Sequence, residues 1–135
     1  MITHVLDSSA ILAHYLGENG AEEVTTYLLS GAEIGVSVVS LVELRTRFRE
    51  LCKDRRHGEQ AFALYCDELC TVLDVNRAVV DAANHLRSIA SGRLPAIDSI
   101  IAATAKLNGA ALVHRDPHFT TIPSNELSQI SLPAK

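Results

Sequence analysis

Tryptophan is absent from this sequence of 135 residues, and aromatic residues make up only 4% of it. Stacking of aromatic side chains on unpaired bases is therefore not an obvious way for the protein to bind nucleic acid. No apolar run reaches the roughly 18 residues that a membrane-spanning helix needs. The N-terminus has no basic segment ahead of an apolar stretch, so we expect neither a signal peptide nor a membrane partner.

Cysteine is also scarce, with residues only at positions 52, 66 and 70. The number is odd and no C-x-x-C spacing occurs, which argues against a disulfide framework or a zinc-binding pair. Cys66 and Cys70 are one helical turn apart, on a face that we expect to be buried. We interpret the cysteines as reduced packing residues of a cytoplasmic protein.

The sequence has no excess of positive charge, and its formal net charge is −4. A nucleic-acid-binding protein usually presents a basic surface, so the total by itself argues against that class. The total conceals a cluster, however. Six of the twelve Lys and Arg residues lie within one short stretch: Arg45, Arg47, Arg49, Lys53, Arg55 and Arg56.

What the sequence does contain is a regular alternation of strand and helix patterns. Strands are predicted at 3–6, 33–37, 71–75 and 110–114, with a short edge strand at 128–132 in an otherwise loose tail. Helices are predicted at 9–16, 19–31, 40–56, 59–70, 76–91 and 95–108. The alternation predicts a three-layer α/β/α sandwich with a central, mostly parallel sheet of four to five strands. No linker divides the chain, so we expect residues 1–135 to form a single domain.

Four acidic residues occupy equivalent places in this pattern. Asp7 ends the first strand and Asp116 follows the fourth, whereas Glu43 and Asp98 fall in the first turns of two helices. In a parallel α/β sheet, the carboxyl ends of strands and the amino ends of helices lie on the same edge, where ligands bind. We therefore expect these four side chains to gather at that edge.

Each acid also has a simpler explanation. Glu43 fits a capping box with Ser40, Asp98 favours a helix dipole, and Asp116 is typical of a turn. Asp7 is the hardest to explain in this way, because a carboxylate at the end of a buried strand is costly unless it is paired.

Several carboxylates at one place repel each other unless some take up protons or a cation binds. Oxygen ligands suit Mg²⁺ or Mn²⁺. His114 and His118 have the i, i+4 spacing of a zinc pair, but Asp116 and Pro117 intervene and no helix is expected there. Bound Mg²⁺ points to phosphate chemistry with an activated water, and the chain contains neither a G-x-S-x-G motif nor a P-loop.

The segments "VLDSSAIL", "SVVSLVEL", "IDSIIAATA" and "LVHRDPHF" together resemble the four acidic motifs of PIN-domain ribonucleases. Their order and spacing, and the length of the chain, resemble in particular the VapC toxins of type II toxin–antitoxin systems. The resemblance extends from about residue 4 to residue 120. It implies a PIN-like fold.

The resemblance also implies roles for individual residues. Asp7, Glu43, Asp98 and Asp116 match the catalytic acids that bind the metal, and Ser9 matches a small hydroxyl residue that supports the first acid. Such a protein is a Mg²⁺- or Mn²⁺-dependent endoribonuclease that cuts single-stranded or loop RNA. Its expected partners are the RNA substrate, a cognate antitoxin protein and a second copy of itself in a homodimer.

Basic residues provide further candidates for binding. Arg45, Arg49, Lys53 and Arg56 form one stripe on the predicted helix at 40–56, which either contacts an RNA backbone or is a solvated face. Arg115, beside Asp116, is positioned either to contact the scissile phosphate or an antitoxin carboxylate, or to face outward. We therefore take Arg45, Arg49 and Arg115 as candidate contacts to RNA or antitoxin.

Other functions fit the sequence less well. A receiver-type signalling module also holds Mg²⁺ at a sheet edge, but it needs an acid pair after the first strand and a late lysine, whereas Ser8 follows Asp7 and Lys106 lies far along a helix. An aspartate-nucleophile phosphatase needs D-x-D, where this chain has Ser9. A PIN-like nuclease of RNA processing, without a toxin role, shares the same chemistry and stays open.

Overall fold

The β-branched runs of the sequence form one five-stranded sheet in the computed structural model, which describes residues 1–135. The strand order is β3-β2-β1-β4-β5, and all neighbouring strands are parallel. The strands are β1 (Ile2–Leu6), β2 (Glu33–Ser37), β3 (Thr71–Leu73), β4 (Ala111–His114) and β5 (Gln129–Ser131). The first strand of the chain therefore lies in the middle of the sheet.

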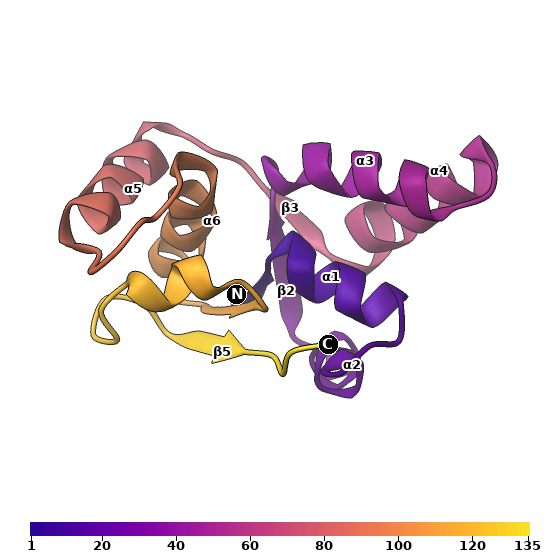
Figure 1. Ribbon diagram of the computed structural model, residues 1–135, viewed down its shortest axis with the longest axis horizontal. Coiled ribbons are helices and arrows are strands. Elements are labelled where there is room, and N and C mark those ends of the chain that lie inside the picture. Colours follow the sequence, from indigo (N-terminus) through magenta and orange to yellow (C-terminus); the bar gives the residue numbers. More distant parts are fainter.

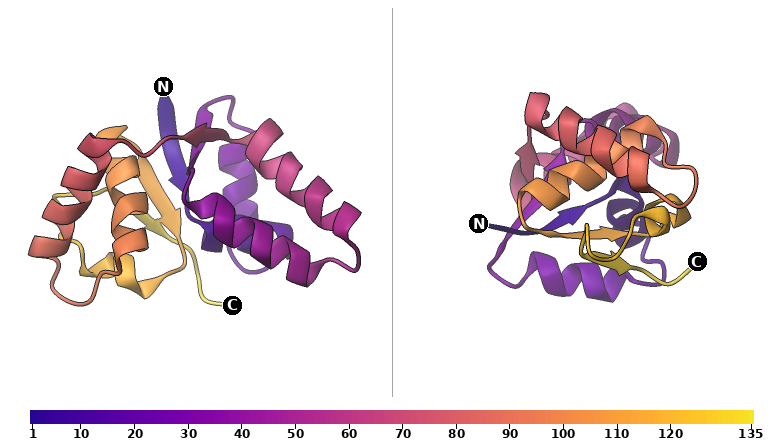
Figure 2. Two further views of the ribbon diagram at one scale, coloured as in Figure 1. Left: turned by 90° about the horizontal axis from the view of Figure 1, so that it is seen from above. Right: turned by 90° about the vertical axis from the view of Figure 1, so that its left-hand side faces the viewer.

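Helices cover both faces of this sheet (Figures 1 and 2). One face carries α1 (Ser8–Tyr15), α2 (Ala21–Leu28), α3 (Ser40–Leu51) and α4 (Arg55–Ala63), the last continued by a π-helical segment, η1 (Leu64–Leu69). The other face carries α5 (Arg77–Ile89) and α6 (Ala96–Leu107). None of the helices combines the length and the apolarity required to cross a bilayer.

The alternation of side chains along the strands produces two hydrophobic cores. Leu6 and Val113 point into the core beneath α1–α4, and their neighbours Val5 and Leu112 point into the core beneath α5 and α6. All four are fully buried, as the central strands of a parallel sheet covered on both faces require. The predicted three-layer α/β/α sandwich is confirmed.

The predicted helix at 40–56 is wrong at its C-terminal end. Cys52 is extended, with φ −98° and ψ 146°, and the side chain of Asp54 starts α4 by accepting from the backbone N–H of His57 at 2.9 Å. Gly58, predicted to separate two helices, instead lies inside α4, where an added Cβ would be 3.2 Å from the carbonyl oxygen of Phe48. Its small size lets the backbones of α3 and α4 approach closely, so the two helices form a hairpin.

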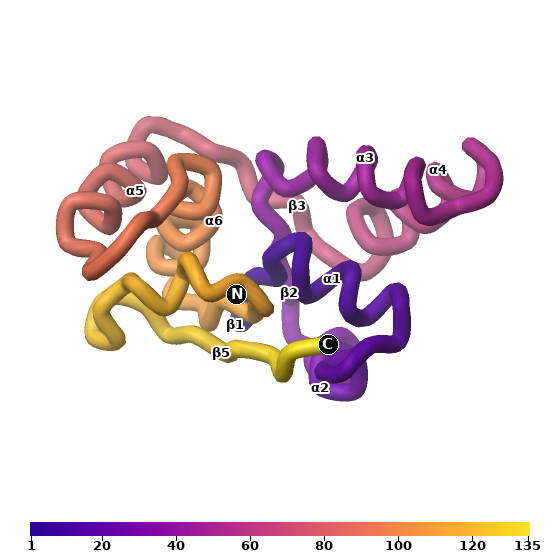
Figure 3. Tube along the Cα trace, viewed as in Figure 1, coloured from indigo at the N-terminus to yellow at the C-terminus, as the bar shows by residue number.

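The C-terminal tail is more ordered than the sequence predicts. A short 3₁₀ helix, η2 (Pro117–Thr121), follows β4, although no helix was expected there. The predicted edge strand is confirmed in β5, and the chain then runs beside α2 (Figure 3). There Leu132 lies against Gly20. The side-chain amide of Asn19 donates to the carbonyl oxygen of Ala134 at 3.1 Å and holds this end.

Replacement of Phe48 by alanine is expected to destabilise the protein strongly. Phe48 is fully buried on α3, stacked on Tyr65 with ring centroids 5.8 Å apart and meeting Tyr15 edge-on at 5.0 Å. The cavity should cost roughly 3–5 kcal/mol in the free energy of unfolding by urea. Leu29→Ala, at a position that is 79% exposed, is the control and should change that free energy by less than about 0.5 kcal/mol. Equal effects of the two substitutions would contradict this packing.

Candidate active site

The sheet topology brings the four predicted acids to one edge. Asp7 follows β1 directly and caps α1, and Asp116 follows β4 and caps η2. Glu43 and Asp98 lie in the first turns of α3 and α6, on opposite faces of the sheet. The charges of Glu43 and Asp98 both act on Asp7, and those of Asp116 and Glu43 act on Asp98, so the four side chains form one electrostatic cluster.

Asp7 is the most deeply buried acid of the cluster, with 5% of its surface exposed. Burial is the main cause that raises the pKa of Asp7 to about 6; the charges of Glu43 and Asp98 act in the same direction, and the hydrogen bonds from Ser9 oppose the shift. These bonds come from the backbone N–H of Ser9 at 3.1 Å and from its hydroxyl at 2.5 Å. The carboxylate is therefore fixed in place but poorly solvated.

Ser9, predicted to support the first acid, connects two strand ends. Its hydroxyl donates to Asp7 and accepts from the backbone N–H of Arg115 at 3.0 Å. The backbone N–H of Asp7 donates in turn to the carbonyl oxygen of Val113, at 3.0 Å. Two hydrogen bonds thus fix the end of β1 relative to the segment that carries Asp116.

Asp98 and Asp116 share a third neighbour, His118. The Nδ1 atom of His118 lies 3.1 Å from an oxygen of Asp116 and 3.3 Å from an oxygen of Asp98. Burial raises the pKa of Asp98 and the charge of Asp116 raises it further, whereas His118 opposes the shift. One donor atom from each of the three residues lies within 4.8 Å of the others.

The sequence does not predict the place of His118 beside the acids, because its i, i+4 spacing with His114 suggests only a zinc pair. Asp116 accepts from the backbone N–H of His118 at 2.9 Å, and this cap turns the imidazole back toward the carboxylates. An Asp-Pro sequence that ends a strand is the signal that predicts such a turn. The position of the ring relative to Asp98 depends on α6 and follows from no local pattern.

His114 takes no part in a zinc site. It is fully buried; its Nε2 atom donates to Gln129 at 2.8 Å, and its Nδ1 atom accepts from the backbone N–H of Asp116 at 3.1 Å. Burial lowers the pKa of His114. One ring nitrogen therefore holds the turn after β4, and the other joins β4 to β5.

Glu43 is the most exposed of the four acids and accepts from the hydroxyl of Ser8 at 2.8 Å. This bond joins the first turns of α1 and α3. The capping box with Ser40 does not form, because Val39 caps α3 and the buried hydroxyl of Ser40 has no hydrogen-bond partner. The simpler explanation for Glu43 is therefore wrong, and the side chain is available to the acid cluster.

The three candidate arginines do not point at the acids. Arg115 donates to Glu18 at 2.9 Å and to the carbonyl oxygen of Asn19 at 2.7 Å, so it secures the connection between α1 and α2. Arg45 and Arg49 lie in a groove between α3 and α4. Because α3 ends at Leu51, the predicted single stripe that also contains Lys53 and Arg56 does not exist.

The residues of the cluster fit a divalent cation. Their donors are carboxylate oxygens with one imidazole nitrogen, a set that suits Mg²⁺ and, because of the nitrogen, suits Mn²⁺ better. Burial and mutual repulsion raise the pKa values of Asp7 and Asp98, and a cation would relieve both effects. Asp98, Asp116 and His118 lie close enough together to hold one metal ion. Asp7 and Glu43 are coupled to Asp98 by charge but lie outside this close group.

Solved structures with this fold include chains of several toxin–antitoxin complexes. One match is a chain of the VapBC2 complex from Rickettsia felis, whose structure contains a DNA fragment from the promoter. It matches with a TM-score of 0.78 at 17% identity, over 98% of this chain and 100% of that one. A chain of VapBC-1 from nontypeable Haemophilus influenzae matches with a TM-score of 0.71 at 23% identity, over 97% and 98%.

A third match is VapC20 of Mycobacterium tuberculosis, a sarcin-ricin loop cleaving toxin, with a TM-score of 0.67 at 16% identity, over 87% of this chain and 93% of that one. No curated protein sequence matches. The family model of the PIN domain matches residues 4–124, which include all four acids of the cluster. The fold and the sequence thus agree, and the chain belongs to the PIN-domain family.

Proposed function

We propose that this protein is an endoribonuclease that uses Mg²⁺ or Mn²⁺ to hydrolyse phosphodiester bonds in RNA. The supporting observation is that Asp98 and Asp116 meet at one sheet edge of a PIN-domain chain, with the buried Asp7 coupled to Asp98 by charge. A divalent ion held there would lower the pKa of a bound water and stabilise the departing oxygen of the substrate.

The side chains around the cluster orient the acids and receive the substrate. Ser9 orients Asp7, and the short cap of η2 orients Asp116. Asp98 comes from α6, on the opposite face of the sheet from α3 and Glu43, so the substrate is received between two layers of helices. Glu43, the most exposed acid, is the one best placed to meet the water or the ribose of the substrate.

RNA as the substrate and a toxin role are supported by the relatives. Structural matches include VapBC complexes and a toxin that cleaves the sarcin-ricin loop. We therefore propose that the chain is the toxin of a toxin–antitoxin pair, that a cognate antitoxin protein is its partner, and that it acts as a homodimer. A PIN nuclease of RNA processing would use the same site and would have no antitoxin.

The cysteines are consistent with action in the reducing cytoplasm. All three are free, and Cys66 and Cys70 are buried. Burial raises the pKa of Cys66 to about 11 and that of Cys70 to about 12, so both thiols stay protonated and unreactive.

The structure also argues against the receiver-type alternative, which needs a lysine beside the acids. Lys106 pairs with Glu126, at the opposite end of α6 from Asp98.

Replacement of Asp7 or Asp98 by asparagine is expected to lower the rate of RNA cleavage by at least about 100-fold, since loss of even an outer partner of a metal ligand costs 10- to 100-fold. Cleavage by the parent should stop in EDTA and return with excess Mg²⁺ or Mn²⁺. Asp81→Asn, an equivalent change on the exposed surface of α5, is the control and should cut at the parental rate. Activity of Asp7→Asn equal to that of the control would end the proposal.

Without metal, Asp7→Asn should make the protein more stable at about pH 8. The folded-state pKa of Asp7, about 6, lies above its usual value of 3.8, so ionisation favours the unfolded chain. Stability from this group is complete below about pH 4 and is lost as the pH rises through 6, a loss of up to about 3 kcal/mol. The amide keeps the α1 cap and carries no charge.

The measurement is urea unfolding of both proteins in EDTA at about pH 8 and pH 4, followed by addition of Mg²⁺. The variant should be more stable at the higher pH, the difference should vanish at the lower pH, and Mg²⁺ should stabilise mainly the parent. A variant that unfolds at lower urea than the parent at about pH 8 would identify Asp7 as a structural residue instead.

His118→Gln should weaken Mn²⁺ binding by about tenfold and Mg²⁺ binding by less, because imidazole nitrogen is a better ligand for Mn²⁺. Titration calorimetry of the two metals measures this difference directly. His57→Gln is the control, since His57 is an exposed histidine on α4 that pairs with Asp54. Unchanged Mn²⁺ binding in His118→Gln would mean that the ring pairs with the acids only when no metal is present.

A further inference from the structure

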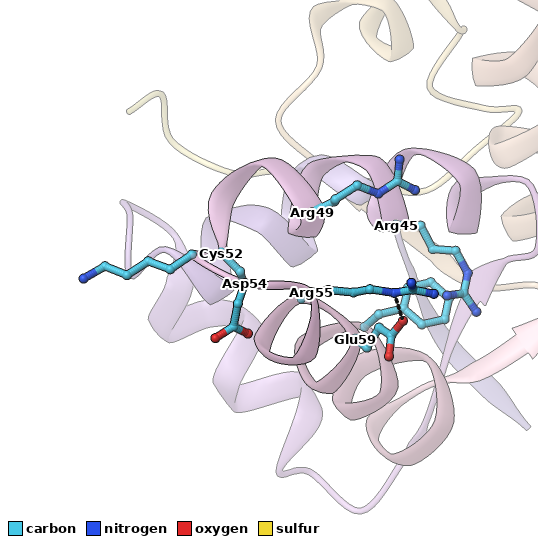
Figure 4. Close-up of a pocket in the computed structure, with 9 residues that line it drawn as sticks. Arg45, Arg49, Cys52, Asp54, Arg55 and Glu59 are labelled. Atoms are coloured by element: carbon cyan, nitrogen blue, oxygen red, sulfur yellow. Dashed lines mark hydrogen bonds and ion pairs between the residues drawn. The ribbon is translucent and has the colours of Figure 1, made fainter.

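A groove of about 500 Å³ runs between α3 and α4, on the outer side of the hairpin that these helices form. Most of its lining is charged, and Figure 4 shows Arg45 and Arg55 extending toward the same end of it while Arg49 points outward from α3. The residues that line it are Arg45, Arg49, Cys52, Lys53, Asp54, Arg55, Gly58, Glu59 and Phe62.

The groove is positive although the chain as a whole carries a net charge of −4. Its two acids are already engaged, because Glu59 accepts from Arg55 at 3.0 Å and Asp54 accepts from His57 at 2.9 and 3.0 Å. Arg45, Arg49 and Lys53 form no ion pair within the protein. Three cations are therefore available to an anionic ligand.

Arg45 is held in place before any ligand arrives. Its guanidinium carbon lies 3.8 Å from the centre of the Phe62 ring, a cation–π contact with an aromatic side chain that is 6% exposed. Gly58 permits the close approach of α4 to α3 that brings Phe62 under Arg45. A fixed guanidinium loses less entropy on binding a ligand than a free one does.

The groove lies close to the acid cluster along the axis of α3. Arg45 and Arg49 follow Glu43 by two and six residues, which is about 3 and 9 Å of helix rise. Glu43 faces α1 through Ser8, whereas Arg45 faces α4. A ligand that contacts both the acid cluster and the groove must cross the outer surface of α3, where Val42 is 74% exposed.

From this arrangement we infer that the α3–α4 groove binds backbone phosphates of the RNA substrate beside the segment that is cut. The inference rests on the proposed nuclease function. Arginine forks match phosphate oxygens in pairs, and the contacts require no particular base. The groove then supplies affinity for longer RNAs and none for a fragment that fills only the acid cluster.

A protein ligand fits this groove less well. An amphipathic helix of a partner requires an apolar groove, and here only Cys52 and Phe62 among the lining residues are apolar. The face of the Phe62 ring is already covered by Arg45. An acidic peptide would use the same cations as RNA does, so the test includes one.

The first measurement is binding of a fluorescein-labelled, single-stranded RNA of about 16 nucleotides to full-length protein in EDTA, by anisotropy over a range of salt concentrations. Arg49→Gln and Lys53→Gln should each weaken binding several-fold and lower the slope of log K against log salt by about 0.7. Arg77→Gln removes the same charge from the exposed surface of α5 and should leave the slope unchanged.

A labelled oligoglutamate peptide is titrated in parallel. If Arg49→Gln and Lys53→Gln bind RNA as tightly as Arg77→Gln does, the inference is overturned. If the variants lose only the peptide, the groove belongs to an acidic protein segment, which also overturns it.

The second measurement is cleavage with Mn²⁺ of RNAs of about 4 and 16 nucleotides, lengths at the two ends of common single-strand site sizes. The groove variants should lose about tenfold in kcat/KM on the longer RNA and keep the parental value on the shorter one. Equal losses on both lengths contradict the inference. A parent that cuts neither RNA contradicts the nuclease function instead, while the binding measurement still decides the role of the groove.

Discussion

The carboxylate of Asp7 lies at the end of the central strand with almost no access to water. The rest of the site must compensate this buried negative charge. A buried anion is unfavourable unless hydrogen bonds or a cation compensate it. Ser9 supplies hydrogen bonds, yet the pKa of Asp7 stays raised because burial and the charges of Glu43 and Asp98 outweigh them. The folded protein thus carries a local instability that a divalent ion would remove.

The parallel sheet is what allows acids from distant segments to share one place. Right-handed crossovers return each strand in the same direction, so strand ends and helix starts accumulate at one edge. Because helices cover both faces, Glu43 approaches from the α3 layer and Asp98 from the α6 layer. The cluster therefore lies across the edge of the sheet, and its geometry depends on both cores being intact.

The remaining polar residues near the cluster hold its framework. His114 is neutral and buried, with both ring nitrogens bonded, and Arg115 is paired with Glu18. The free cations are concentrated in the α3–α4 groove instead. This separation of acids at the sheet edge from cations on the outer hairpin suits a protein that binds a metal and a polyanion side by side.

The sequence alone determined the layered α/β fold and the gathering of the four acids at one sheet edge, because these depend on local periodicity and on the connection rules of parallel sheets. It did not determine where α3 ends, since Cys52 and Lys53 carry no stop signal and the break depends on Gly58 packing against Phe48. Nor did it determine that His118 reaches Asp98, that Ser8 rather than Ser40 pairs with Glu43, or that Arg115 turns to Glu18. Such contacts join residues that are distant in the chain, and only the packing of whole helices on the sheet brings their side chains within hydrogen-bonding distance.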